Sequence, residues 1–267
     1  MANTSKNKTT AKTKQAVAAA ETDTGRSKKS RVRRVSVVVL LIVGIVIFGI
    51  IALFTTLAVL VHTSNVRASN AEYDFLRGLA GDIDIELDEH GDVRFNALDE
   101  EMRAINPDFV CWLRIDGTNI DYPVVRGVDN DKYLNTSFYG EDNIAGAIFM
   151  DYRNDGDKLP HIIIYGHNLQ QGGMFTDLRR FLNKQFLEDN DTITLIVNGH
   201  PVEFEIFSAR LSDIRDPAYN LNVNTSRLFA RFATSVDAPL HATQIITLST
   251  CTSSGGDNAR LIVQGYR

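Results

Sequence analysis

Residues 244–266 have the sequence QIITLSTCTSSGGDNARLIVQGY, and this stretch decides the fold of the C-terminal part of the chain. Gln244 to Ser249 is a short apolar run, a polar stretch rich in Ser, Thr, Gly and Asp follows, and Arg260 to Tyr266 is a second apolar run. Such runs, separated by turn residues, predict two antiparallel neighbouring strands. Cys251 and Arg260 are therefore expected at the same rim of a sheet, where loops leave room for a substrate.

Six further short runs with β-type composition precede this pair. They are Phe109 to Ile115, Asn119 to Val125, Ala145 to Met150, His161 to Tyr165, Thr192 to Val197 and Val202 to Leu211. Eight short strands predict a mostly β domain that forms a barrel or a sandwich.

Apolar residues at helical spacing predict helices beside these strands. Two of them, Met174 to Phe181 and Ser226 to Ala233, are expected to cover the barrel. Two more are expected before the first strand: a short lead-in helix over Ala71 to Ala80, and a helix carrying Leu98, Met102 and Ile105 that Asn106-Pro107 ends.

Charge divides the N-terminal part of the chain. Residues 1–34 contain ten Lys or Arg against Glu21 and Asp23, lack an apolar period, and are predicted to be a disordered basic tail. Residues 35–61 contain no charged side chain, and a helix of that length spans a bilayer. We interpret them as a signal-anchor helix, followed by an extracellular linker and helix over residues 62–97 and a catalytic domain over residues 98–267.

The basic tail places the N-terminus in the cytoplasm and the domain after the span outside the cell, as a single-pass protein of the cell membrane. A cleaved signal peptide is the competing interpretation. Its apolar region is normally only about 7 to 15 residues, and the nearest small-residue site, around Ala68 to Ala71, is poor. The uncleaved anchor is the better prediction.

The exported part is acidic. Residues 68–267 carry 17 Lys or Arg against 31 Asp or Glu, a net charge of −14, which argues against a nucleic-acid partner. Two hundred residues can bury one core, and no internal repeat is present, so one extracellular domain is expected.

The chain has two cysteines, Cys111 and Cys251, so a disulfide framework is excluded although the compartment would permit one. Cys111 lies in the apolar run FVCWL and is expected to be a small buried hydrophobe. Cys251 follows a strand end, and a thiol there becomes a nucleophile when a cationic or hydrogen-bonding environment favours the thiolate.

A histidine partner for Cys251 is expected, and His167 is the best of the six candidates. It follows the apolar run IIIYG, which delivers the imidazole to the end of a buried strand. A structural histidine is the alternative. No cofactor and no metal site are predicted, because no Cys or His cluster has ligand spacing, and the acidic run from Asp82 to Glu89 has Leu87 where a calcium loop requires Gly.

These motifs resemble the sortase family, specifically class B. The resemblance rests on TLSTC at 247–251 with Arg260, and on YGHN at 165–168. It extends in order over roughly residues 98–267, through WLRI at 112–115, TNIDYPVV at 118–125, DN at 129–130, YL at 133–134, FYG at 138–140 and AGAIFMDYRN at 145–154.

The resemblance implies an eight-stranded sortase barrel with N-terminal and peripheral helices, and a cysteine transpeptidase activity. It implies Cys251, His167 and Arg260 as catalytic residues. It also implies a peptide groove lined by Asn130, Leu134, Ser249, Thr252 and Tyr219. The substrates would be surface proteins or pilins with a C-terminal sorting signal that is cleaved after threonine, and the acceptor would be an amine of a peptidoglycan precursor.

Two alternatives stay open at the level of sequence. A sortase that polymerises pilins uses a lysine as the acceptor amine, and the sequence does not separate it from a cell-wall sortase. A surface domain that binds peptides without catalysis is the alternative from another class, and the joint presence of Cys251, His167 and Arg260 argues against it.

Overall fold

The computed structural model describes residues 39–61, 64, 71–80, 96–154, 159–170, 172–252 and 256–267. Two compact units are present, Met1–His62 and Thr63–Arg267. The predicted basic tail, the acidic run from Asp82 to Glu89 and residues 35–38 of the predicted span lie outside the described residues.

The first unit contains one described helix, Val39–Val61. All of its 23 residues are exposed and none is charged, and the helix is long and apolar enough to cross a membrane. At about 1.5 Å per residue it measures roughly 35 Å, which exceeds the hydrocarbon thickness of a bilayer of about 30 Å.

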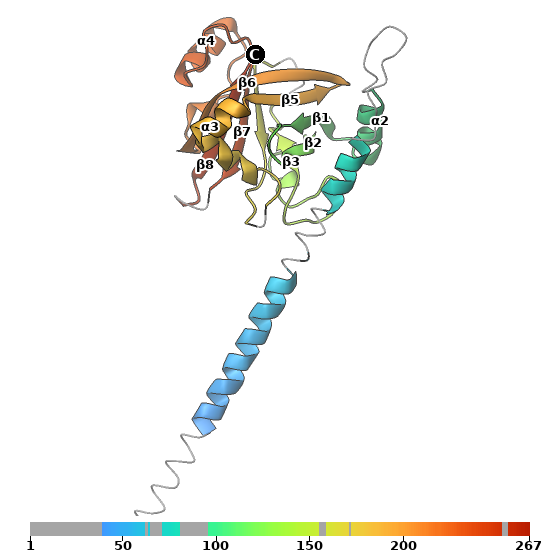
Figure 1. Cartoon of the computed structure of the whole chain (residues 1–267), viewed down its shortest axis with the longest axis vertical. Coiled ribbons are helices and arrows are strands. Elements are labelled where there is room, and N and C mark those ends of the chain that lie inside the picture. Colours follow the sequence, from blue (N-terminus) through green and yellow to red (C-terminus); the bar gives the residue numbers. More distant parts are fainter. Residues whose placement is uncertain are drawn as a thin grey trace, which may run out of the picture. The chain divides into compact units, whose positions relative to one another are not determined.

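The second unit is an eight-stranded closed barrel with the strand order β1-β2-β3-β4-β7-β8-β6-β5 (Figure 1). The β2–β3 and β4–β7 pairs are parallel, and the other pairs are antiparallel. The strands are β1 (Phe109–Arg114), β2 (Asp121–Val125), β3 (Ile148–Met150), β4 (His161–Tyr165), β5 (Thr192–Val197), β6 (His200–Asp213), β7 (Ile245–Cys251) and β8 (Ala259–Tyr266).

The predicted mostly β class and the eight strands are confirmed, and several strand lengths differ from the prediction, most of all those of β6 and β3. β6 extends over 14 residues because its first half pairs with β5 and its second half with β8, so backbone pairing continues beyond the apolar run. β3 begins at Ile148 instead of Ala145. Gly146 adopts a left-handed conformation with φ of 60°, which turns the chain immediately before the strand.

Helices before β1 close one side of the core. The helix over residues 71–80 buries Tyr73 and Leu76, and α2 (Asn96–Ile105) buries Leu98 and Met102. The Tyr73 hydroxyl donates to the Gly146 carbonyl at 3.0 Å. Both predicted helices are present, and α2 ends before Asn106-Pro107 as expected.

Short helices lie in the connections between strands. They are η1 (Lys132–Leu134), η2 (Thr176–Leu182), α3 (Lys184–Asp189), η3 (Pro217–Tyr219) and α4 (Ser226–Ser235). The segment predicted as a helix over Met174 to Phe181 is the 3₁₀ helix η2, and the one predicted over Ser226 to Ala233 is α4. Phe232 of α4 and Val236, which follows the helix, pack against Ile245 and Tyr266 in a small second core, beside the C-terminus of the chain (Figure 1).

Candidate active site

The register between β4 and β7 brings the predicted histidine and cysteine to one end of the barrel. Tyr165 pairs with Ser249 in parallel, so His167 and Cys251 each follow two residues later on neighbouring strands. The Asn168 side-chain amide donates to the Cys251 carbonyl at 3.0 Å, which ties the two strand ends together. Cys251 is exposed and Cys111 is buried, and both are free thiols.

Gly166 makes this close approach possible. A Cβ at this position would overlap Ile148 Cδ1 and the Phe175 ring. The Gly166 carbonyl accepts a hydrogen bond from Thr250 Oγ1 at 2.7 Å. Any larger residue would have to displace the Ile148 side chain or the Phe175 ring beside the loop that carries His167.

The register between β7 and β8 determines the position of Arg260, the third of the predicted catalytic residues. Cys251 is the direct antiparallel partner of Arg260. The Arg260 Nη1 group donates to the carbonyls of Asp257 and Ala259 at 2.8 and 2.9 Å. These bonds fix the guanidinium, whose planar fork of donors suits a developing oxyanion.

The His167 imidazole has a defined tautomer. Its Nε2 lies 2.7 Å from the Leu134 carbonyl oxygen. A carbonyl oxygen only accepts, so Nε2 carries a proton in this arrangement. In the neutral ring, Nδ1 is then the nitrogen that carries no proton.

A pocket of about 350 Å³ unites these groups. All the predicted site residues line it except Thr252, whose backbone N–H donates to the Ala259 carbonyl at 3.3 Å. The lining residues are Asn130, Asp131, Leu134, Phe149, Tyr165, Gly166, His167, Ile214, Tyr219, Ser249, Thr250, Cys251 and Arg260.

Asn130 is held rigidly in the pocket wall. Its Nδ2 donates to Asp151 Oδ2 at 3.1 Å, and its Oδ1 accepts from the Tyr152 N–H at 3.0 Å. Asp151 is fully buried and also binds Arg153 in an ion pair of 2.7 Å and the Tyr165 hydroxyl at 3.0 Å. Burial alone would raise the pKa of Asp151, but these hydrogen bonds hold it below its usual range.

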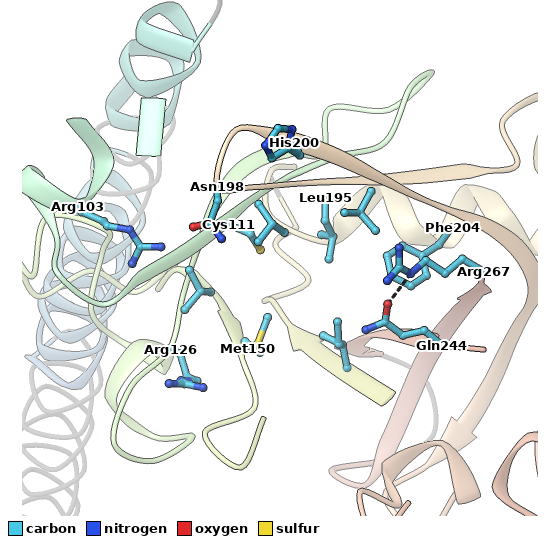
Figure 2. Close-up of a pocket in the computed structure, with 14 residues that line it drawn as sticks. Arg103, Cys111, Arg126, Met150, Leu195, Asn198, His200, Phe204, Gln244 and Arg267 are labelled. Carbon is cyan, nitrogen blue, oxygen red and sulfur yellow. Dashed lines mark hydrogen bonds between the residues drawn. The ribbon is translucent and has the colours of Figure 1, made fainter. Parts of the chain in front are cut away.

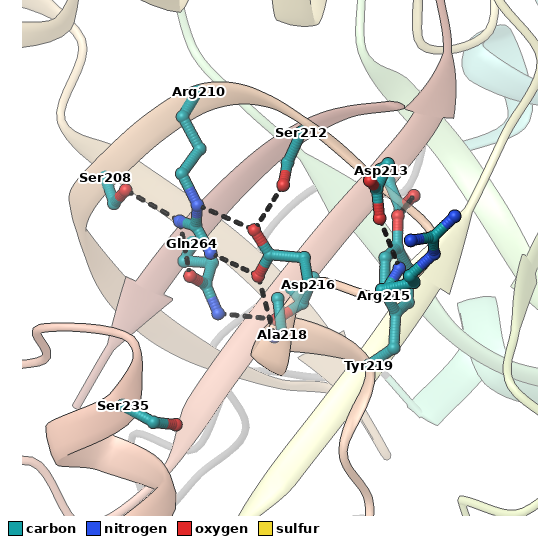
Figure 3. A network of polar contacts seen from close by, with 12 residues as sticks. Ser208, Arg210, Ser212, Asp213, Arg215, Asp216, Ala218, Tyr219, Ser235 and Gln264 are labelled. Carbon is teal, nitrogen blue, oxygen red and sulfur yellow. Dashed lines mark hydrogen bonds and ion pairs between the residues drawn. The ribbon is translucent and has the colours of Figure 1, made fainter. Parts of the chain in front are cut away.

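Tyr219 contacts Ser249 across the pocket, with 2.7 Å between the two hydroxyl oxygens. Burial raises the pKa of Tyr219, so its hydroxyl stays protonated. Tyr219 is the last residue of η3, and Asp216 caps this turn by accepting from the Ala218 N–H at 2.8 Å (Figure 3).

Asp216 is itself anchored to the barrel. Arg210 on β6 binds its carboxylate with two nitrogens, at 2.7 and 3.1 Å, and Ser212 donates to it at 2.6 Å (Figure 3). Arg210 also donates to Gln264 Oε1 on β8 at 2.8 Å. We call Arg210, Asp216 and Gln264 the β6–β8 polar cluster. It fixes the start of the β6–β7 connection.

His161 fixes the other side of the same turn. Its Nδ1 donates to the carbonyl of Asn220 at 2.9 Å, and its Nε2 lies 2.9 Å from Thr247 Oγ1. Because Nδ1 carries the proton of the neutral ring, Nε2 accepts from Thr247. Burial lowers the pKa of His161 to about 4. Hydrogen bonds to both neighbours of Tyr219, Ala218 and Asn220, therefore fix its position.

Asp151, Asp216 and His161 were not predicted as members of the site. Asp151 lies in the AGAIFMDYRN motif, which was the one available signal for it. In the ranges that the structure describes, no group of three or more His, Cys, Asp or Glu side chains could hold a metal ion. A thiol, an imidazole and a guanidinium in one open pocket can perform nucleophilic acyl transfer.

The family model of the sortase domain matches residues 113–267, more than half of the chain. The chain belongs to the sortase family. Sortase B of Listeria monocytogenes is 35% identical over 193 residues, which cover 66% of this chain and 75% of that protein. The predicted resemblance to class B is therefore confirmed, and this sortase is a cysteine transpeptidase.

Solved structures of class B sortases have the same fold. That of Clostridium perfringens sortase B has a TM-score of 0.58 and 31% identity, covering 63% of this chain and 98% of its own. A substrate complex of Staphylococcus aureus sortase B has a TM-score of 0.63 and 25% identity, covering 75% and 96%. Each of those solved chains is matched over nearly its full length, and residues 63–267 form one compact unit in this sortase.

Proposed function

We propose that this sortase is a membrane-anchored transpeptidase that cleaves a C-terminal sorting signal after threonine and transfers the protein to an amine of the cell wall. The observation that carries the proposal is the position of Cys251 at the rim of the 350 Å³ pocket, with Arg260 as its direct strand partner and His167 on the neighbouring strand end. The Staphylococcus aureus relative has been solved as a substrate complex.

In the first step, the Cys251 thiolate attacks the carbonyl carbon of the threonine. A carbon–sulfur bond forms, and the negative charge moves to the carbonyl oxygen, where the Arg260 guanidinium stabilises it. The peptide carbon–nitrogen bond then breaks, and His167 donates a proton to the departing amine. The product is a thioester on Cys251.

In the second step, an acceptor amine attacks the thioester carbonyl. His167, now neutral, takes the proton of the amine, the new amide forms, and Cys251 leaves as a thiolate. The cycle therefore starts from a thiolate and an imidazolium. The Leu134 carbonyl, 2.7 Å from Nε2, orients the ring in both states, because Nε2 is a donor whether the ring is neutral or charged.

The peptide is proposed to lie along Asn130, Leu134, Tyr219 and Ser249, with Thr252 at the exit from β7. The first four line the pocket, where Asp151 holds Asn130, and Tyr219 and Ser249 hold each other. A wall whose side chains are already ordered loses little conformational entropy when a substrate binds.

We also propose that residues 35–61 anchor the enzyme, with the basic tail of residues 1–34 in the cytoplasm and the catalytic domain, residues 98–267, outside the cell. The exposed, uncharged helix Val39–Val61 and the ten basic residues before it support this topology. Protease treatment of intact cells tests it: the full chain should lose its barrel and keep a short membrane-protected N-terminal fragment.

The activity is tested with residues 63–267, threonine-containing sorting peptides and a glycine-based amine or a lysine-bearing pilin, beside Cys251→Ala. Transfer to the glycine amine supports cell-wall anchoring, and a polymer ladder supports the pilin-polymerising alternative. Hydrolysis alone indicates a protease, and binding without a thioester indicates the non-catalytic domain.

A further inference from the structure

In the part of the chain that the structure describes, Asp131 is the only Asp or Glu that lines the pocket around Cys251, which we call the Cys251 pocket. Its side chain is exposed and has no hydrogen bond or ion pair to any other described residue. A second pocket of about 360 Å³, where Arg267 donates to Gln244 (Figure 2), shares no lining residue with it and has no Asp or Glu in its described lining. The carboxylate therefore distinguishes the catalytic pocket, and neither the transpeptidation steps nor the proposed groove uses it.

The backbone of Asp131 is fixed at the start of η1. Its N–H donates to Asp129 Oδ1 at 3.0 Å, and its carbonyl accepts from the Leu134 N–H at 3.1 Å. The carbonyl of the same Leu134 lies 2.7 Å from His167 Nε2. Asp131 and the residue that holds the catalytic imidazole therefore belong to one turn of 3₁₀ helix.

Neighbouring cations do not neutralise Asp131. Lys132, the next residue along the chain, pairs with Asp108 at 2.5 Å. Arg260 is the only Lys or Arg in the described lining, and it belongs to β8, whereas Asp131 directly precedes η1. The Cys251 pocket thus offers one site for negative charge at β8 and a separate site for positive charge at η1.

The charges in the Cys251 pocket change when the cysteine is acylated. In the proposed mechanism, the sulfur becomes an uncharged thioester, and His167 is neutral after it has protonated the departing amine. Asp131 is then the one negative charge in the described lining at the moment when the acceptor must bind. A primary amine is mostly an ammonium at pH 7, because the pKa of an α-amino group is about 8. A charged side chain in a cleft attracts a counter-charge more strongly than one on open surface.

We propose that Asp131 binds the acceptor as a primary ammonium and thereby selects an amine over water in the second step. The proposal rests on the function proposed for Cys251. The ammonium loses one proton to solvent, and its nitrogen becomes positive again as it attacks the thioester carbonyl. His167 takes the second proton, the carbon–nitrogen bond forms, the carbon–sulfur bond breaks, and Cys251 leaves as a thiolate. The carboxylate of Asp131 stabilises both positively charged forms of the acceptor.

The partition of the acyl-enzyme between an amine and water tests the proposal. The full chain in detergent micelles is loaded with the benzyl thioester of N-acetylthreonine, an activated donor that contains no sorting signal beyond its threonine. Glycinamide is the acceptor. Asp131→Asn should lower the ratio of transfer to hydrolysis about threefold to fivefold, the scale of an exposed ion pair, while the rate of loading stays unchanged. Salt at about 0.5 M should remove most of this difference, because it shortens the Debye length to about 4 Å.

An anionic nucleophile separates the effect of charge from a structural effect. 2-Mercaptoethanesulfonate attacks the thioester as a thiolate, so its reaction should not become slower in Asp131→Asn. Asp131→Glu keeps the charge and should keep most of the transfer to glycinamide. Asp131→Lys should lower that transfer about tenfold, because the interaction is reversed as well as removed. Asp237→Asn, at an exposed position after α4, is the matched control and should behave like the wild type.

The outcomes distinguish this proposal from the function on which it rests. An unchanged ratio in Asp131→Asn with normal loading, an equal loss with the anionic thiol, or an equal loss in Asp237→Asn would overturn the role of Asp131 and leave that of Cys251 intact. A wild-type enzyme that is not loaded at all would contradict the function proposed for Cys251, and the role of Asp131 with it.

Discussion

Cys251 and Arg260 are direct partners across β7 and β8, and eight residues lie between them along the chain. The short connection between β7 and β8 therefore brings a thiol and a guanidinium to one rim of the barrel. His167 reaches that rim by a different route, through the parallel pairing of β4 with β7. The site is thus assembled from three neighbouring strands.

Replacement of Arg260 by Lys tests the role of the forked guanidinium. The charge is kept, but the two fixed carbonyl contacts of Nη1 are lost. We expect kcat/KM for peptide cleavage to fall about 100-fold, mainly in kcat, because the oxyanion is stabilised in the transition state. Arg231→Lys on α4 is the matched control. Steady-state kinetics within about twofold of wild type for Arg260→Lys would contradict the assigned role.

The hydroxyl contact between Tyr219 and Ser249 predicts energetic coupling. Tyr219→Phe and Ser249→Ala should each raise KM for the peptide, and each leaves a buried hydroxyl without its partner. A double-mutant cycle measured by urea unfolding of residues 63–267 should give a coupling energy of about 1 kcal/mol. Tyr139→Phe, at a half-exposed tyrosine, is the control. Additive effects would show that the two hydroxyls do not act together.

Asp216→Asn should loosen the turn that carries Tyr219. The Asp216 side chain is 7% exposed and that of its partner Arg210 is 29% exposed. We expect a loss of about 2 kcal/mol in the free energy of unfolding, less than the 3–5 kcal/mol of a fully buried pair, because water screens Arg210. KM for the peptide should rise with it. Asp237→Asn, at an exposed position, is the control, and unchanged thermal stability of Asp216→Asn would refute the expectation.

The burial of His161 predicts that the folded domain becomes less stable in acid. Its pKa is lowered to about 4 in the folded state, so between pH 6.5 and 4 the unfolded chain binds the extra proton. The free energy of unfolding is therefore at its full value above about pH 6.5. It decreases as the pH falls towards 4, by about 2 kcal/mol at pH 5.

Urea unfolding of residues 63–267 at pH 7 and pH 5 measures this loss. His161→Gln should reduce the difference between the two pH values by about 2 kcal/mol, whereas His241→Gln at an exposed position serves as the control. An unchanged difference in His161→Gln would assign the acid sensitivity to other groups.

The local sequence pattern was sufficient to predict the strands and the pairing of Cys251 with Arg260. Apolar runs and turn residues are properties of neighbouring positions, so the eight strands and both helices before β1 were predicted correctly. The position of Cys111 in an apolar run likewise predicted its burial. The sortase motifs added the family, which the comparisons confirm.

The side-chain hydrogen bonds around the site were not predicted. The apolar pattern does not indicate that Arg210, Ser212 and the Ala218 N–H, all within six residues of Asp216, converge on its carboxylate. His161 was known only as a residue that begins a strand, and its partner Thr247 is 86 positions away. The catalytic roles of the trio stay predictions.

The most direct test is the intact mass of residues 63–267 after mixing with a threonine-containing sorting peptide. The account predicts an adduct with the mass of the peptide up to its threonine, bound as a hydroxylamine-sensitive thioester. The adduct should be absent in Cys251→Ala and present in Cys111→Ala, which removes the buried thiol. An adduct that persists without Cys251, or cleavage of the peptide by Cys251→Ala at the wild-type rate, would contradict the central claim.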